Sequence, residues 1–217
     1  MTSFRVTSQT LHPNQYNILG ECDTDDFVRH VAIAAEGWSH NRMSFPVVHM
    51  GPPLNRGGAM RADAVGTVVL TVDELEVIKR FAQLHISEHG STKFCRTNSH
   101  QFYCIHPHAS PFSESDGRYV RTRFSCVGFV YECYKQAGIQ LLDVTNQPVV
   151  DLDRIRNCYP VFSRLLDITK SRNLMGLTGD GPWPVMLCGY LFHSLARGDD
   201  EIRSTPYCPQ ASDAHFP

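Results

Sequence analysis

Short apolar runs rich in β-branched residues predict strands in the first half of the chain. Residues 28–35 combine alternating polarity with β-branched side chains, and residues 15–19, 45–50 and 65–70 have a similar character. Residues 52–58 are rich in Pro and Gly and predict a loop between two of these strands. The first half is therefore expected to be mostly β.

Helical spacing of apolar residues begins later in the chain. Thr71 opens the sequence T-V-D-E, a capping box in which the Thr and Glu side chains satisfy each other's backbone amides. Apolar residues then recur at helical spacing over residues 72–87. Ser125 precedes a second such stretch, residues 126–137, which Gly138 ends. These signals predict two helices.

The remaining segments are organised by polar residues and prolines. Asp151 begins a further helical stretch, and Pro160 suits the first position of the next helix. Residues 90–123 are polar and form a long excursion, with one strand candidate at 101–106. The last residues, 198–217, are polar and predict a C-terminal tail.

Length and charge limit the possible classes of protein. A chain of 217 residues with 42% apolar residues can bury one good core, so we expect a single α+β domain over residues 1–197. The formal net charge of −2, spread along the chain, offers no basic surface for a polyanion. Nucleic acid is therefore not an expected partner.

Neither a membrane span nor a signal peptide is expected. The longest apolar stretches, such as residues 185–191, are far shorter than the roughly 20 residues needed to cross a bilayer. Residues 1–15 are polar and lack the apolar core of a signal peptide. A cytoplasmic location follows as the expectation, and in that reducing compartment most of the eight cysteines should be free thiols.

Among these cysteines, Cys126 has a distinctive position at the first turn of a predicted helix. The unpaired amides of a helix N-terminus stabilise a thiolate and can also donate to an oxyanion. Gly128, two residues later, lowers helix stability by about 1 kcal/mol relative to Ala. Its presence indicates that another group approaches the helix closely at this point.

Residues 125–139, S-C-V-G-F-V-Y-E-C-Y-K-Q-A-G-I, resemble the nucleophile helix of the NlpC/P60 proteins. These are papain-like cysteine peptidases and amidases with the pattern Asp-Cys-Ser-Gly-Phe-Val, followed by a helix that ends Ala-Gly-Ile. Ser125 and Val127 depart from that pattern, so the side chains that the family has at those two positions are missing here. The resemblance implies a papain-like α+β fold in which a small antiparallel sheet packs on the nucleophile helix.

A histidine upstream of the cysteine is similar to the base of this family. His30 lies in F-V-R-H-V-A-I-A-A-E-G, which resembles the family's His-Val-Gly-Ile strand. The order His before Cys resembles the circularly permuted branch, which includes YiiX-like hydrolases and lecithin:retinol acyltransferase-like enzymes. The resemblance covers roughly residues 15–142 and implies catalysis by Cys126 and His30 without a metal or organic cofactor.

The alternation of side chains between the two faces of a strand suggests a third candidate catalytic residue. In a strand, His30 shares one face with two alanines, so a helix could pack closely there. If residues 28–35 pair with 45–50 so that Ile33 faces Pro46, His49 lies directly opposite His30. His49 could then orient the His30 ring. Should the register differ, Glu36, His40 or an aspartate from 23–26 remain as candidates for that role.

Further residues are candidates for binding the substrate or stabilising an oxyanion. They are Tyr103, Tyr119, Glu36 and Trp38. A separate set, Cys95, His100, Cys104, His106 and His108, contains zinc-ligand atoms, but its spacings fit no compact zinc motif, so no metal is expected.

Three hypotheses about function follow. The first is an amidase or peptidase that forms an acyl-enzyme with a peptide or another amide. The second is an acyltransferase or thioesterase that uses the same Cys–His pair. The third is a catalytically silent binding module that keeps the fold.

Overall fold

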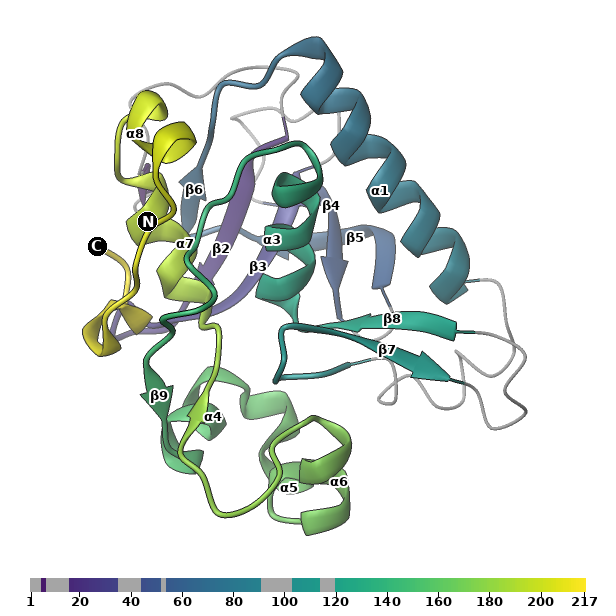
Figure 1. Ribbon diagram of the computed structural model, residues 1–217, viewed down its shortest axis with the longest axis vertical. Helices are drawn as coiled ribbons and strands as arrows, with labels where there is room; N and C mark the ends of the chain where they lie inside the picture. The colour runs from purple at the N-terminus through teal and green to yellow at the C-terminus, as the bar shows by residue number, and fades with distance from the viewer. Residues whose placement is uncertain (1–4, 7–15, 35–43, 52–53, 91–102, 114–119) are drawn as a thin grey trace.

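A six-stranded sheet forms the centre of the part of the chain that the structure describes. The computed structural model describes residues 5–6, 16–34, 44–51, 54–90, 103–113 and 120–217 (Figure 1). The strands of this sheet are β1 (Arg5–Val6), β2 (Ile18–Cys22), β3 (Val28–Ala34), β4 (Ser44–Met50), β5 (Leu54–Arg61) and β6 (Ala64–Gly66). Their order is β1-β6-β2-β3-β4-β5, with β1 parallel to β6 and the other neighbours antiparallel.

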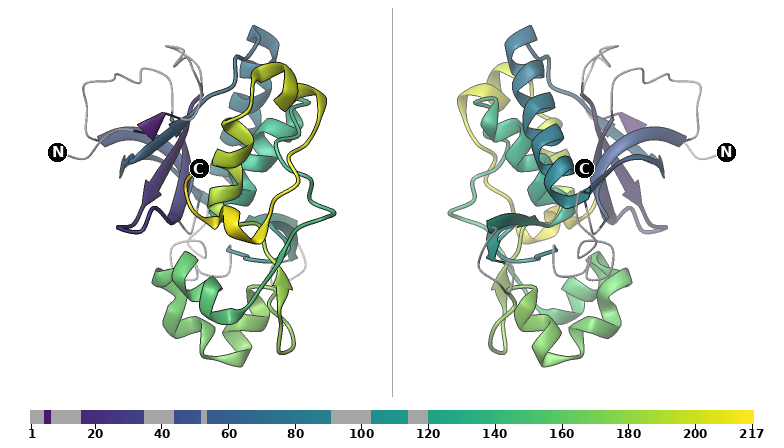
Figure 2. Two further views of the ribbon diagram at one scale, coloured as in Figure 1. Left: turned by 90° about the vertical axis from the view of Figure 1, so that its left-hand side faces the viewer. Right: turned by 90° about the vertical axis from the view of Figure 1, so that its right-hand side faces the viewer.

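Three helices cover one face of this sheet: α1 (Val72–Gly90), α3 (Cys126–Gln136) and α7 (Cys188–Leu195) (Figures 1 and 2). Shorter helices lie together beyond one end of the sheet, and they are α4 (Leu152–Cys158), η2 (Pro160–Phe162), α5 (Ser163–Leu166) and α6 (Thr169–Leu174). The chain is thus of the mixed α+β class, as the sequence predicted.

The helix α3 is deeply buried over most of its length. Apolar side chains surround most of it, and Phe129, Tyr131 and Tyr134 are completely buried. The Tyr134 hydroxyl donates to the Tyr16 carbonyl at 2.6 Å, which ties the helix to the chain just before β2. Since burying an aromatic or aliphatic side chain contributes about 1.5–3 kcal/mol, α3 is a rigid support for any residue at its start.

The helix signals of the sequence are confirmed. Thr71 and Glu74 form the predicted capping box, with the Thr71 amide donating to the Glu74 carboxylate at 2.7 Å. Asp151 caps α4 by accepting from the Arg154 amide at 2.8 Å. Pro160 begins η2, as its missing amide and fixed φ favour.

One loop prediction and one strand prediction are wrong. The Pro- and Gly-rich segment expected to be a loop forms β5, and Gly57 is the residue that the register between β4 and β5 skips. A glycine in a strand often marks such a bulge, which the composition alone does not distinguish from a loop. The strand expected at 65–70 ends at Gly66, although Val68 and Leu70 are still buried in the core.

The excursion at 90–123 contains a hairpin that the sequence did not predict. Strands β7 (Ala109–Ser113) and β8 (Val120–Phe124) pair antiparallel and lead directly into α3. The strand expected at 101–106 is reduced, in its described residues, to a single bridge between Tyr103 and Phe124.

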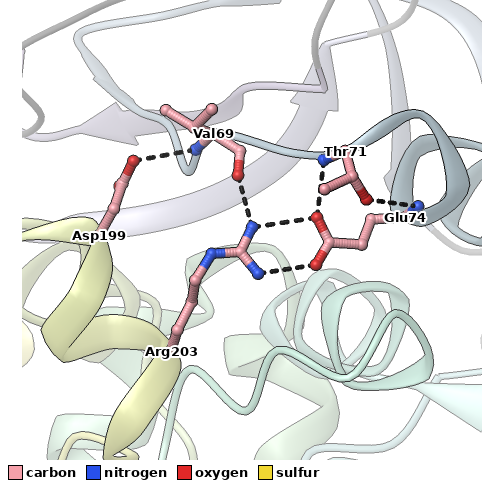
Figure 3. Close-up of polar contacts among 5 residues, drawn as sticks. All are labelled: Val69, Thr71, Glu74, Asp199 and Arg203. Atoms are coloured by element: carbon pink, nitrogen blue, oxygen red, sulfur yellow. Dashed lines mark hydrogen bonds and ion pairs between the residues drawn. The ribbon is translucent and has the colours of Figure 1, made fainter.

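The segment 198–217, expected to be a polar tail, packs against the rest of the chain. It contains α8 (Asp199–Ser204) and η3 (Ala211–Ala214), whose residues Ile202 and Ala214 are buried. Figure 3 shows Arg203 of α8 bound to the Glu74 carboxylate at 2.7 and 3.0 Å and to the Val69 carbonyl. A few apolar residues, spaced among charged ones, make this packing. Because the segment is polar overall, its composition did not reveal them.

Candidate active site

A cavity of about 360 Å³ lies where β2, β3 and β4 meet the start of α3 and the segment of α4 and η2. Its lining residues are Glu21, Arg29, His30, Met50, Gly51, Tyr103, Cys126, Cys158, Tyr159, Pro160, Val161 and Phe162. Most of these side chains are apolar or aromatic. The two principal candidates, Cys126 and His30, therefore face the same cavity from segments far apart in the sequence.

The start of α3 holds Cys126 at a helix N-terminus. Ser125 is the N-cap, and its hydroxyl accepts a hydrogen bond from the Gly128 amide at 2.9 Å. A Cβ atom on Gly128 would lie 2.0 Å from the His108 carbonyl oxygen, which also accepts from the Ser125 amide at 3.0 Å. The close approach predicted at Gly128 is thus made by the chain's own backbone, which fixes the first turn of α3.

Cys126 and His30 face each other across the same cavity, and each favours the charged form of the other. The Cys188 thiol and the His30 ring outweigh the opposing effect of burial and hold the pKa of Cys126 well below its usual range. Burial disfavours the His30 cation, but the Cys126 sulfur and the Glu21 carboxylate outweigh it and raise the pKa of His30. The arrangement favours a thiolate–imidazolium pair.

His49 lies beside His30, as predicted. The His30 Nε2 and His49 Nδ1 atoms are 2.9 Å apart, and the two rings meet edge to face. Since Nε2 of His30 is engaged by His49, Nδ1 is the ring nitrogen left for the Cys126 sulfur. An imidazolium donates from both nitrogens, so His49 acts as the acceptor in this pair.

The predicted strand register is wrong by two residues. Ile33 pairs with Val48 and not with Pro46, which places His49 opposite Ala32. A shift of two residues preserves side-chain parity, so His49 becomes the diagonal neighbour of His30 instead of its direct partner. The imidazole side chains are long enough to bridge that diagonal, and the predicted contact survives.

The predicted packing of α3 on the alanine face of β3 is also wrong. Ala32 and Ala34 belong to a second cluster with Leu19 and Val47, while the core that contains α3 uses Val31 and Ile33. A β-bulge interrupts β3 at the level of His30, because His30 pairs with Glu21 but Val28 already pairs with the next residue, Cys22. Bulges redirect side chains, and this one lies directly beside the histidine.

Tyr103 is the oxyanion candidate that the structure brings to the cysteine. Its hydroxyl lies 3.8 Å from the Cys126 sulfur and 3.5 Å from the Cys126 backbone nitrogen. Burial, together with the neighbouring Cys126 sulfur, raises the pKa of Tyr103 well above its ordinary value, so the hydroxyl stays protonated. It can therefore donate to negative charge that develops near the cysteine.

Cys188 is a site residue that sequence analysis missed. It is the first residue of α7, and its sulfur lies 3.5 Å from that of Cys126. Contact with Cys126 and burial both raise the pKa of Cys188 well above its usual range, so it remains a thiol that can donate to the Cys126 thiolate. In the sequence, Cys188 is marked only by its position at the start of an apolar stretch with helical spacing.

The other candidates stand apart from this site or cannot be placed. Glu36, Trp38, His40 and Tyr119 lie outside the described residues, as do Cys95 and His100. His108 instead binds Glu132 of α3 at 3.0 Å. Within the described ranges, no group of three or more His, Cys, Asp or Glu residues could hold a metal ion.

Comparisons with family models, curated proteins and solved structures gave no significant match to the chain. The site is therefore interpreted from its own geometry. Among the described helices, none has the length and apolar character needed to span a membrane.

Proposed function

We propose that this protein is a cysteine-nucleophile hydrolase that acts on an amide or a related carbonyl through an acyl-enzyme. The single observation that carries the proposal is the arrangement of Cys126, His30 and His49. A thiol at a helix N-terminus lines the same cavity as an imidazole that lowers the pKa of the thiol, and this imidazole lies 2.9 Å from a third polar group. Such a set provides a nucleophile, a base and an orienting residue.

The proposed mechanism begins with the thiolate–imidazolium pair. The Cys126 sulfur attacks the carbonyl carbon of the substrate, and His30 then gives its proton to the leaving group as general acid. In the second half-reaction, His30 takes a proton from water, which attacks the thioester and releases the acid. His49 keeps the His30 ring in a fixed orientation through both steps.

The backbone amide of Cys126 and the Tyr103 hydroxyl would stabilise the oxyanion in both half-reactions. The tetrahedral intermediate carries its negative charge on the former carbonyl oxygen, within reach of donors beside the sulfur. Before any substrate binds, the Cys126 amide donates to the Tyr103 hydroxyl at 3.5 Å, so a substrate oxyanion would replace this contact and accept from both groups. In this proposal, the sheet that carries the histidines and the helix that carries the cysteine correspond to a permuted papain-like fold.

An acyltransferase or thioesterase is the second candidate, and the cavity wall favours it. Much of the cavity wall is apolar or aromatic, with Met50, Tyr159, Val161 and Phe162 among its lining residues. Such a wall suits an apolar acyl group better than a polar peptide chain. Val161 is 87% exposed although it borders the cavity. The chemistry at Cys126 is the same in both candidates, and only the acceptor of the acyl group differs.

Trapping of the acyl-enzyme tests the proposal without knowledge of the natural substrate. The protein is mixed with activated esters, thioesters and amides of increasing acyl length, and the intact mass is followed with time. We expect a transient acyl adduct on Cys126 that disappears more slowly in His30→Ala. A competing amine or alcohol then shows whether water or another nucleophile accepts the acyl group.

Two variants serve as controls. Cys126→Ala and Cys126→Ser should lose the adduct while keeping the fold, because the position tolerates a small side chain. Cys158→Ala removes a thiol from the same cavity wall and should still form the adduct. An adduct that persists in Cys126→Ala, or a wild-type protein that forms none with any acyl donor, would favour the silent binding module.

A further inference from the structure

Cys126 and Cys188 form a buried pair of thiols contributed by the first residues of two different helices. Their sulfur atoms are 3.5 Å apart, close to van der Waals contact, and the two residues are 1% and 2% exposed. A disulfide bond measures about 2.05 Å, so bond formation requires each sulfur to move by less than about 1 Å. Of these two residues, Cys126 lines the cavity and Cys188 does not.

We propose that this pair is a redox modification site, at which a small hydroperoxide oxidises Cys126 and Cys188 resolves the product as an intramolecular disulfide. The proposal rests on the proposed function in one respect: the thiolate that would attack a carbonyl is the species that would attack the peroxide. The disulfide would occupy the nucleophile and switch the enzyme off reversibly.

The reaction takes place in two steps. The Cys126 thiolate attacks one oxygen of the peroxide, the O–O bond breaks, and the other oxygen leaves as hydroxide or alkoxide and takes a proton. This gives a sulfenic acid at Cys126. The Cys188 sulfur then attacks the Cys126 sulfur, the S–O bond breaks, and the hydroxyl leaves with the Cys188 proton as water. Two thiols lose two electrons, and the peroxide gains them.

The position of the two thiols suits this order of events. The two cysteines are almost equally buried, but only Cys126 of the pair lines the cavity through which a molecule as small as hydrogen peroxide would approach. Without a resolving thiol, a sulfenic acid can oxidise further to an irreversible sulfinic acid. A disulfide is instead returned to two thiols by exchange with a small thiol, and such bonds are transient in a reducing compartment.

The test uses the full chain treated with limiting hydrogen peroxide. Intact-mass measurement and peptide mapping before and after dithiothreitol report the products. We expect the wild type to lose the mass of two hydrogens, to yield a Cys126–Cys188 linked peptide, and to regain both thiols on reduction. Cys188→Ser should instead accumulate a Cys126 sulfenic acid that dimedone traps, followed by sulfinic acid that dithiothreitol does not reverse.

Cys158→Ser is the matched control, because Cys158 lines the same cavity, and it should form the Cys126–Cys188 link as the wild type does. Three results would overturn the proposal: a link from Cys126 to Cys158, over-oxidation of Cys126 in the wild type while Cys188 stays reduced, or no reaction with peroxide. Since none of these readouts depends on turnover, the link can form even if acyl-enzyme trapping fails, and the reverse also holds.

Discussion

The His30 Nε2 atom lies 2.9 Å from the His49 Nδ1 atom, and this contact joins two adjacent strands beside Cys126. We expect His49→Ala to lower the rate of acyl-enzyme formation by roughly tenfold to a hundredfold, less than the loss of Cys126 itself. His49→Asn or His49→Gln should restore part of the rate, because an amide oxygen can accept from the His30 ring. Intact-mass kinetics with an activated ester measures all three.

A purely structural role for His49 would give a different pattern. The Asn and Gln variants would then be as slow as the Ala variant, or all three would lose thermal stability in parallel with rate. Thermal unfolding measured on the same samples separates these cases.

Gly128 is expected to be indispensable for the packing of α3. An added Cβ would meet the backbone carbonyl oxygen of His108 at 2.0 Å, and a backbone atom has little freedom to move away. Gly128→Ala should therefore lower the free energy of unfolding by about 1–3 kcal/mol. Gly198→Ala, where a Cβ meets nothing within 4 Å, should change it by less than about 1 kcal/mol. Urea denaturation compares them, and equal effects would contradict the close packing at Gly128.

The ion pair between Glu74 and Arg203 predicts a stability that depends on pH. Hydrogen bonds from Arg203 lower the pKa of Glu74 from 4.5 to about 2. A depressed carboxyl pKa contributes stability above the unfolded-state value, and this contribution is lost as pH falls from about 4.5 to 2. Because Arg203 is partly exposed, solvent screens the ion pair. Glu74→Gln should therefore lower the free energy of unfolding by about 1–2 kcal/mol at pH 7.

Unfolding experiments at pH 7 and pH 2.5 test this expectation. The wild type and Glu74→Gln should differ at neutral pH and approach each other in acid. Glu201, whose exposed carboxylate lies 3.8 Å from Arg197, supplies the control, and Glu201→Gln should have an effect below about 0.5 kcal/mol. If Glu74→Gln lowers the free energy of unfolding by the same amount at both pH values, the charge of Glu74 does not hold α8 in place.

Local signals in the sequence predicted α1, α3 and α4, and they singled out Cys126 and His30. Thr71, Ser125 and Asp151 begin their helices through side-chain to backbone hydrogen bonds, which depend on neighbours in the chain. The link between Cys126 and His30 came from a motif resemblance, and the contact with His49 from side-chain parity. Parity is insensitive to a register error of two residues, which is why the contact was predicted correctly from a wrong pairing.

Features set by long-range contacts were not predictable in this way. The register of β3 against β4 depends on bulges that composition does not reveal. Cys188 lies 62 residues after Cys126, and only the packing of α7 beside α3 brings the two sulfurs together. The docking of α8 through Arg203 likewise depends on a partner far upstream, so a polar segment was taken for a tail.

The pH dependence of Cys126 alkylation tests the central claim most directly, because it requires no substrate. Iodoacetamide labelling of Cys126, followed by peptide mass spectrometry from acid to alkaline pH, should rise at a pH well below that of an ordinary thiol, near 8.5. In His30→Ala this rise should shift to higher pH, while His215→Ala, an exposed histidine away from the cavity, should match the wild type. A wild-type profile that rises only near the ordinary thiol pKa, or one that His30→Ala leaves unchanged, would contradict the thiolate–imidazolium pair and the acyl-enzyme mechanism built on it.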